Sequence, residues 1–145
     1  MITYPRILFP LDLSKESQVV AEHVAAMVDK FGSELHIVNV VPTYEGPTFS
    51  SVENVMDEIK HNVLQEMDQF AAKHFPGMEQ VKTKVLTGHS GRQVLNYIEK
   101  ENISLVIMGT HGRSGLGAVF FGSVAQRVVQ SSNVPVMTVH PVREG

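Results

Sequence analysis

Hydrophobic positions along the chain alternate between short continuous runs and longer stretches with helical spacing. The runs have the length and β-branched content of buried strands, and they occupy Ile7–Phe9, Glu34–Val41, Val81–Thr87, Ile103–Met108 and Val136–His140. After each of the first four runs, apolar residues recur at every third or fourth position. This alternation predicts one α/β domain over residues 1–145, with a doubly wound, mostly parallel sheet and helices on both faces.

Serine and glycine residues mark where the predicted helices begin and end. Ser14, Ser50 and Ser90 precede three of the helical stretches, and serine is favoured at the N-cap. Ser50 also opens a capping box, and Gly32 is a typical C-terminal stop. One long apolar face runs along the second stretch, and it comprises Val52, Met56, Ile59, Val63, Met67, Phe70 and His74. We expect both methionines on this face to lie in the core.

Lysines distinguish the third predicted strand from the others. Within Val81–Thr87, Lys82 and Lys84 occupy alternate positions, so one face of the strand carries positive charge. Charged side chains of this kind are typical of edge strands, where they discourage pairing with another chain. The sequence therefore predicts this strand at an edge of the sheet.

Composition narrows the classes of function. The chain has 12 Lys and Arg against 15 Asp and Glu, a net charge of −3, and no basic run. Nucleic acid is therefore not an expected partner. Cysteine is absent, which removes thiolate chemistry, and no apolar stretch approaches the ~20 residues of a membrane-spanning helix. Since no leader peptide is recognisable from Met1 to Pro10, we expect a cytoplasmic protein without membrane insertion.

The seven histidines show no pair at metal-ligand spacing, so we expect no protein-built metal site. His111 differs from the others because it lies in a glycine-rich segment. An imidazole at that place could act as acid, base or hydrogen-bond donor, and a purely local role is the interpretation that we favour.

The glycine-rich segment, Gly109–Ser123, follows the fourth predicted strand and leads into a helical stretch. Glycines let a loop approach a ligand closely, and the first turn of a helix presents unpaired N–H groups to a phosphate. The chain contains no G-x-x-x-x-G-K-[ST] phosphate loop, and these glycines do not follow the G-x-G-x-x-G dinucleotide pattern. Their spacing instead matches G-x-x-G-x9-G-[ST], from Gly109 and Gly112 to Gly122 and Ser123.

Asp12 lies at the end of the first predicted strand, in the segment Pro10-Leu11-Asp12 that follows Phe9. In a doubly wound sheet, ligands bind at the carboxyl ends of the strands where the winding reverses. If the first and fourth strands are neighbours, this carboxylate lies beside the phosphate-binding segment, where it suits the two hydroxyls of a ribose. Two simpler interpretations stay open: Asp12 as a turn residue, and Gly109 with Gly112 as a tight turn without a ligand.

Five motifs, in the same order along nearly the whole chain, resemble the universal stress protein family and specifically its ATP-binding branch. They are Ile7–Ser14, Val38–Pro42, Val106–Gly112, Gly122–Ala125 and Ser132–Val136. The resemblance implies five parallel strands in the order 3-2-1-4-5, the adenine nucleotide alpha-hydrolase-like fold. The chain departs from the family at Leu13, where many relatives have a small residue, often glycine.

The resemblance further implies a nucleotide site, a metal ion and a dimer. The implied nucleotide-binding residues are Pro10, Asp12, Val40, Met108, Gly109, Gly112, Arg113, Gly122, Ser123 and Val124. Asp12 would hold the ribose and the backbone of Val40 the adenine. The ligand would be ATP, ADP or AMP, with Mg²⁺ or Mn²⁺ on its phosphates. Many members dimerise through the last strand, here Val136–Val139, whose uncharged edge suits pairing.

Two of these residues have a second interpretation. Ser123 is also a good helix N-cap, a role that is compatible with facing a phosphate. Arg113 could contact a terminal phosphate or lie in solvent.

Three classes of function follow from the sequence. The first is a nucleotide-binding regulatory protein with at most slow ATP hydrolysis. The second is an ATPase or nucleotidyl transferase, against which stands the absence of a Walker lysine and of an acid–base constellation. The third is an interaction module without nucleotide, against which stands the intact glycine spacing. The sequence therefore favours the first class.

Overall fold

The computed structural model describes residues 1–47, 49–110 and 122–140 of the chain. Strands and helices alternate within them: β1 (Arg6–Pro10), α1 (Ser17–Phe31), β2 (Glu34–Val41), α2 (Ser50–His74), β3 (Val81–Thr87), α3 (Ser90–Lys100), β4 (Leu105–Gly109), α4 (Ser123–Ser131) and β5 (Val136–Val139). The strands form one parallel sheet in the order β3-β2-β1-β4-β5. The predicted class, strand order and edge position of β3 are confirmed.

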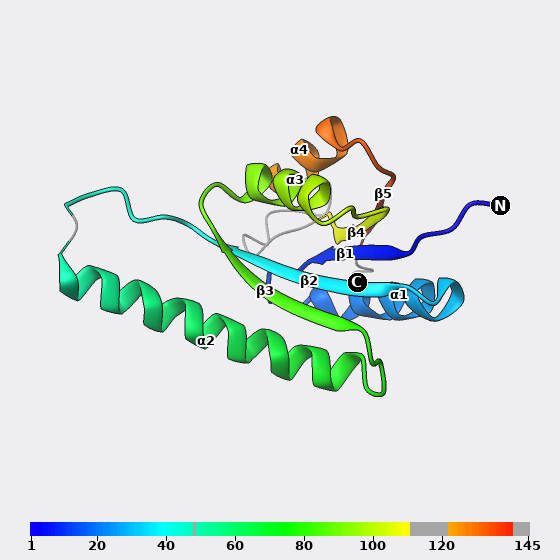
Figure 1. Ribbon diagram of the computed structural model, residues 1–145, viewed down its shortest axis with the longest axis horizontal. Helices are drawn as coiled ribbons and strands as arrows, with labels where there is room; N and C mark the ends of the chain where they lie inside the picture. Colours follow the sequence, from blue (N-terminus) through cyan, green and yellow to red (C-terminus); the bar gives the residue numbers. More distant parts are fainter. Residues whose placement is uncertain (48, 111–121, 141–145) are drawn as a thin grey trace, which may run out of the picture.

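Two apolar layers enclose the sheet, with α1 and α2 on one face and α3 and α4 on the other (Figure 1). The alternation of β1 shows how the layers share one strand. Ile7 and Phe9 lie in the layer under α1 and α2, whereas Leu8 lies in the layer under α3 and α4. All three side chains are buried, as expected for a central parallel strand covered on both faces.

Helix α1 begins later than the serine pattern predicts. Its N-cap is Glu16, so the prediction of Ser14 as the N-cap is wrong. The backbone N–H of Ser14 instead donates to Oδ1 of Asp12 (3.0 Å), and this bond holds Ser14 in the turn that follows β1. Gly32 ends the helix in the left-handed conformation, with φ 61°, as predicted.

The other predicted serine caps are shifted by one position. Phe49 caps α2, so Ser50 is already helical and forms no capping box. His89 caps α3, because its Nδ1 accepts the backbone N–H of Arg92 at 3.5 Å. Gly122 is the cap of α4, so the alternative of Ser123 as an N-cap is also wrong.

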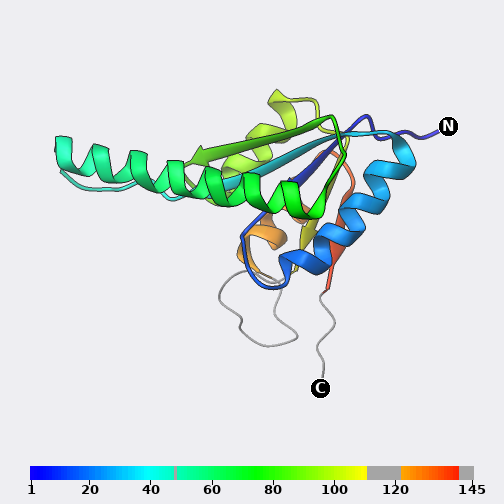
Figure 2. The same cartoon turned by 90° about the horizontal axis from the view of Figure 1, so that it is seen from below.

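Helix α2 is longer than the sheet face that it covers, and its N-terminal half extends past the strands (Figure 2). Met67 in the C-terminal half is fully buried, as predicted. Met56 in the N-terminal half is only partly buried and belongs to neither core layer, so its prediction as a core residue is wrong. The apolar face of α2 is therefore continuous in the sequence, but only its C-terminal half packs in the core.

Among the described helices, none combines the length and the apolar character that crossing a membrane requires.

Candidate functional site

The main cavity lies at the carboxyl ends of β1, β2 and β4, and its volume is about 510 Å³. The strand order reverses its direction of winding between β1 and β4, so the cavity occupies the switch point of the sheet. Helices from both faces contribute walls: Ser17 and Val20 from α1, Val94 from α3, and the first turn of α4. The volume is within the ~300–1,000 Å³ range of small-molecule pockets.

The cavity gathers the candidate residues that the sequence placed far apart. Eight of the ten line it, namely Pro10, Asp12, Val40, Met108, Gly109, Gly122, Ser123 and Val124. Gly112 and Arg113, together with His111, lie outside the described residues. The sheet topology produces this convergence, because β1 is hydrogen-bonded to both β2 and β4.

Asp12 has a structural role as well as a place in the cavity wall. Its Oδ1 accepts the Ser14 N–H at 3.0 Å and the Ser17 hydroxyl at 2.9 Å. These bonds connect the end of β1 to the first turn of α1, so the turn interpretation of Asp12 is correct. They do not exclude a ligand, since a carboxylate has about four acceptor positions on its two oxygens.

Asn39 is a polar cavity residue that the sequence did not single out. Its Nδ2 donates to the carbonyl of Leu11 at 2.7 Å, and Leu11 N–H donates to the carbonyl of Val38 at 2.8 Å. Together the two bonds fix the end of β1 beside the end of β2. The signal available in the sequence was a lone amide within an apolar strand, which implies a local partner.

Two apolar residues of α2, Ile59 and Val63, also line the cavity. Ile59 remains 39% exposed, because it lies where the helix begins to extend past the sheet. The helical spacing assigned this face to the core, yet it could not show where the sheet ends beneath it. The overhang of α2 therefore provides an apolar wall that periodicity alone does not reveal.

The start of α4 faces the cavity and is tied to the end of β4. Gly122 N–H donates to the carbonyl of Thr110 at 2.7 Å, and Gly122 carbonyl accepts the Gln126 N–H at 2.9 Å. Gly122 has ordinary backbone angles, φ −57° and ψ 150°, and no side-chain cap hydrogen bond is found for α4 among the described residues. The amides of its first turn are the groups that a helix N-terminus offers to an anion.

Charge in the cavity is negative within the described part of the chain. The ionisable side chains in its lining there are Asp12 and Glu16, and the rest is apolar or neutral polar. The described residues also contain no cluster of three or more metal-ligating side chains. Within the described residues, the groups of this lining that suit an anionic ligand are the backbone amides at the start of α4.

Leu13, the position at which the chain departs from the family pattern, has φ 59°. Left-handed backbone is strained for leucine and relaxed for glycine, which explains why a small residue suits this position. The side chain of Leu13 packs against the core layer of α1 and α2, and this contact offsets part of the strain.

Substitution of Leu13 separates the two effects. We expect Leu13→Gly to be more stable than Leu13→Ala by about 1 kcal/mol, because both lose the packing and only glycine relieves the strain. Urea unfolding of both variants measures the difference. The exposed helical position Ala72 serves as the control, because alanine is there more stable than glycine. Ala72→Gly should therefore lower the free energy of unfolding by about 1 kcal/mol. Equal stability of the two Leu13 variants would contradict the assigned strain.

The chain is similar to known proteins over nearly its full length. The sequence model of the universal stress protein family matches residues 3–140. Universal stress protein MJ0531 of Methanocaldococcus jannaschii is 30% identical over 144 residues, covering 94% of this chain and 82% of the relative.

Solved structures share the fold. Universal stress protein UspA from Lactobacillus plantarum superposes with a TM-score of 0.84 at 21% identity, covering 96% of this chain and 99% of that one. A universal stress protein in complex with cAMP has a TM-score of 0.69 at 16% identity, covering 97% and 100%. A universal stress protein from Archaeoglobus fulgidus in complex with dAMP has a TM-score of 0.62 at 17% identity, covering 95% and 98%. The family match, the relative and the shared fold agree, and the chain belongs to the universal stress protein family.

Proposed function

We propose that this protein binds ATP, or another adenine nucleotide, in the main cavity and acts as a cytoplasmic regulatory protein with at most slow hydrolysis. The observation that carries the proposal is the convergence of eight candidate residues from three strand ends and α4 on one cavity of about 510 Å³. Two proteins of the same fold were solved with adenine nucleotides, cAMP and dAMP, which is consistent with the proposal.

The walls of the cavity suggest how the nucleotide lies. The base is assigned to the apolar side, between Val40, Met108 and Ile59, where the backbone of Val40 can bond its polar edge. The ribose is assigned to Asp12, whose carboxylate can accept from its hydroxyls. The phosphates are assigned to the first turn of α4, beginning at Gly122, where free amides and the helix dipole favour negative charge.

A divalent cation fits this arrangement. Phosphates that enter the cavity meet the carboxylates of Asp12 and Glu16, and like charges in a partly enclosed site repel. Mg²⁺ or Mn²⁺ is usually bound through substrate phosphates with one or two carboxylates, so no dedicated cluster of protein ligands is required. We therefore assign the ion to the phosphates, with Asp12 and Glu16 as the nearest acidic groups.

The residues that line the main cavity favour a role in nucleotide binding over efficient catalysis. The two carboxylates are its only ionisable side chains within the described ranges, and one of them holds the turn after β1. Rapid phosphoryl transfer needs a positioned base and cationic groups on the transferred phosphate. We accordingly propose that bound nucleotide acts mainly as a regulatory signal.

We also propose that the protein forms a dimer through β5. This strand pairs with β4 on one side and forms the outer edge of the sheet on the other. Its residues Val136–Val139 carry no charge, and such an edge is normally covered in a stable protein. Antiparallel pairing of two β5 strands across a two-fold axis would cover both edges.

Nucleotide titration of Asp12→Asn tests the site. Asparagine keeps the oxygen that accepts from Ser14 and Ser17, so the turn should survive. Loss of a charged acceptor for the ribose should weaken ATP about tenfold, and 2′-deoxy-ATP by a smaller factor. The readout is calorimetric titration with and without Mg²⁺, with Glu16→Gln as the control that removes a cavity charge without the ribose contact.

Two results would count against the proposal. Equal losses of ATP and 2′-deoxy-ATP in Asp12→Asn would remove the ribose assignment. Failure of the unmodified protein to bind any adenine nucleotide would remove the function itself.

A further inference from the structure

A second hollow of about 520 Å³ opens beside the main cavity, between the loops after β2 and β3 and the first turns of α3 and α4. It is lined by Pro42, Thr43, Glu45, Gly88, His89, Ser90, Gly91, Ser123, Val124 and Arg127. Four of these residues, Pro42, Ser90, Ser123 and Val124, also line the main cavity. The two spaces therefore adjoin at the start of α4.

Arg127 reaches this hollow from α4 by crossing α3 at Gly91. A β-carbon built on Gly91 would lie 2.5 Å from Cδ of Arg127 and 3.3 Å from its Cγ. The space that any other residue would fill is thus occupied by the aliphatic stem of Arg127. Gly91 itself is buried, so the stem of Arg127 is held against the backbone of α3, although the residue as a whole is exposed.

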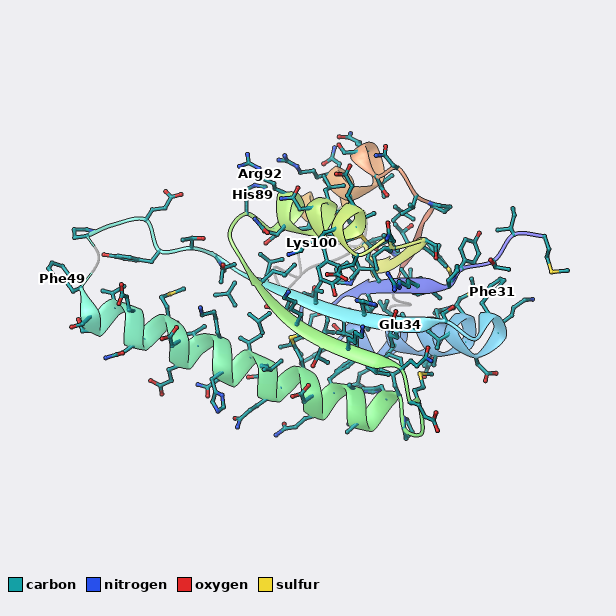
Figure 3. All side chains as sticks on the ribbon, viewed as in Figure 1. Phe31, Glu34, Phe49, His89, Arg92 and Lys100 are labelled. Carbon is teal, nitrogen blue, oxygen red and sulfur yellow. The ribbon has the colours of Figure 1, made fainter. Side chains whose placement is uncertain are left out.

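Arg127 brings a permanent positive charge to the lining of the hollow. Arg127 forms no ion pair with an acidic side chain in the described part of the chain, although the protein carries a net charge of −3. His89 lines the hollow at the start of α3, and Arg92 lies beside it at the same end of the helix (Figure 3). Glu45, on the loop after β2, is the opposing carboxylate among the described residues that line the hollow.

We propose that this hollow binds a phosphoryl group through Arg127, next to the start of α4. A guanidinium recognises a tetrahedral oxyanion with two parallel N–H donors, and a held side chain loses less freedom on binding. The phosphoryl group has two sources: a free polyphosphate, or the distal end of a nucleotide that extends past Ser123. The second source, but not the first, rests on the function proposed above.

Three probes distinguish these sources: inorganic tripolyphosphate, AMP and diadenosine tetraphosphate. Arg127→Gln should weaken tripolyphosphate and diadenosine tetraphosphate about tenfold and leave AMP unchanged, because AMP has no group that reaches the hollow. Arg92→Gln is the matched control, since it removes an equal charge at the start of α3 from a side chain that does not line the hollow. A loss confined to tripolyphosphate identifies a separate anion site, and a loss confined to diadenosine tetraphosphate identifies an extended nucleotide.

Two further variants act without removing the arginine. Gly91→Ala should displace the stem of Arg127 and reduce tripolyphosphate affinity, while thermal stability stays the same or rises, because alanine favours a helix. Glu45→Gln should strengthen tripolyphosphate binding severalfold by removing the opposing charge. Unchanged affinity for tripolyphosphate and diadenosine tetraphosphate in Arg127→Gln, or an equal loss in Arg92→Gln, would overturn the proposal. Failure of AMP to bind would instead count against the main site.

Discussion

Replacement of Gly122 by valine is expected to lower the affinity for ATP by about 100-fold, the equivalent of roughly 3 kcal/mol of binding free energy. Gly122 lies at the cavity wall, where its Cα and the first amides of α4 face the assigned phosphates. A branched side chain there would occupy the space that a phosphate needs in order to reach those amides. AMP, which carries one phosphate, should lose less affinity than ATP.

The fold should tolerate this change. Gly122 has φ −57° and ψ 150°, angles open to any residue, and both of its backbone hydrogen bonds can persist with valine. Loss of the preferred glycine at the N-cap should cost about 1 kcal/mol of folding stability. Gly122→Ala, with one methyl group, is the graded control and should lose less affinity. A folded Gly122→Val protein that retains full ATP affinity would remove the start of α4 from the site.

The sequence predicted the sheet well because its signals are local and redundant. β2 and β3 have the predicted bounds, since each is a run closed by proline or glycine. The order of the strands came from the family resemblance, and the convergence of Asp12 with Gly122 followed from that order. The part of the site that was predictable from the sequence therefore consists of residues that lie close to the ends of strands.

Features that depend on where helices and strands end relative to one another in the folded protein were not predictable from the sequence. The stripe of α2 is continuous in sequence, yet only the structure shows that Ile59 lines a cavity and that Met56 lies outside the core. At the start of α1, Ser14 does not cap the helix, and its N–H donates to the carboxylate of Asp12 instead. The second hollow depends on the contact between Arg127 of α4 and Gly91 of α3, two residues that are 36 positions apart, so no local pattern in the sequence indicates it.

A partly buried polar cluster at the opposite end of the sheet was also not predictable from the sequence patterns. Glu34, at the start of β2, lies there, far from His89 at the N-terminal end of α3 (Figure 3). Its Oε2 lies 2.9 Å from Nε of Arg6, and its Oε1 lies 2.9 Å from Nζ of Lys82. The cluster therefore joins β1, β2 and β3 through one carboxylate.

His36 links this carboxylate to α3. Its Nδ1 lies 2.6 Å from the hydroxyl of Tyr97, and burial raises the pKa of Tyr97 to about 12, so the phenol keeps its proton. We infer that the phenol donates to Nδ1, which places the other ring N–H toward Glu34. The 3.3 Å between Nε2 and Oε2 of Glu34 lacks hydrogen-bond geometry, so this contact is electrostatic.

Glu34 should make folding stability depend strongly on acid. The hydrogen bond from Lys82 is the largest cause that lowers the pKa of Glu34 from 4.5 to about 2. Because the pKa is lower in the folded protein, the stabilisation is fully present above pH 4.5 and is lost as the pH falls toward 2. Complete linkage would give roughly 3 kcal/mol, and solvent around Lys82 reduces this to about 2 kcal/mol.

Urea unfolding of the unmodified protein and of Glu34→Gln, at pH 7 and at pH 3, measures this contribution. We expect the variant to be less stable by about 2 kcal/mol at pH 7, and the gap to narrow at pH 3, where part of the linked stabilisation is already lost. Glu58→Gln, which removes an exposed carboxylate from α2, should show no such gap at either pH. A gap for Glu34→Gln that is equal at both pH values would mean that packing or hydrogen-bond geometry, and not the charge of Glu34, connects the three strands. Under that result, the cluster would connect the three strands without making folding stability depend on acid.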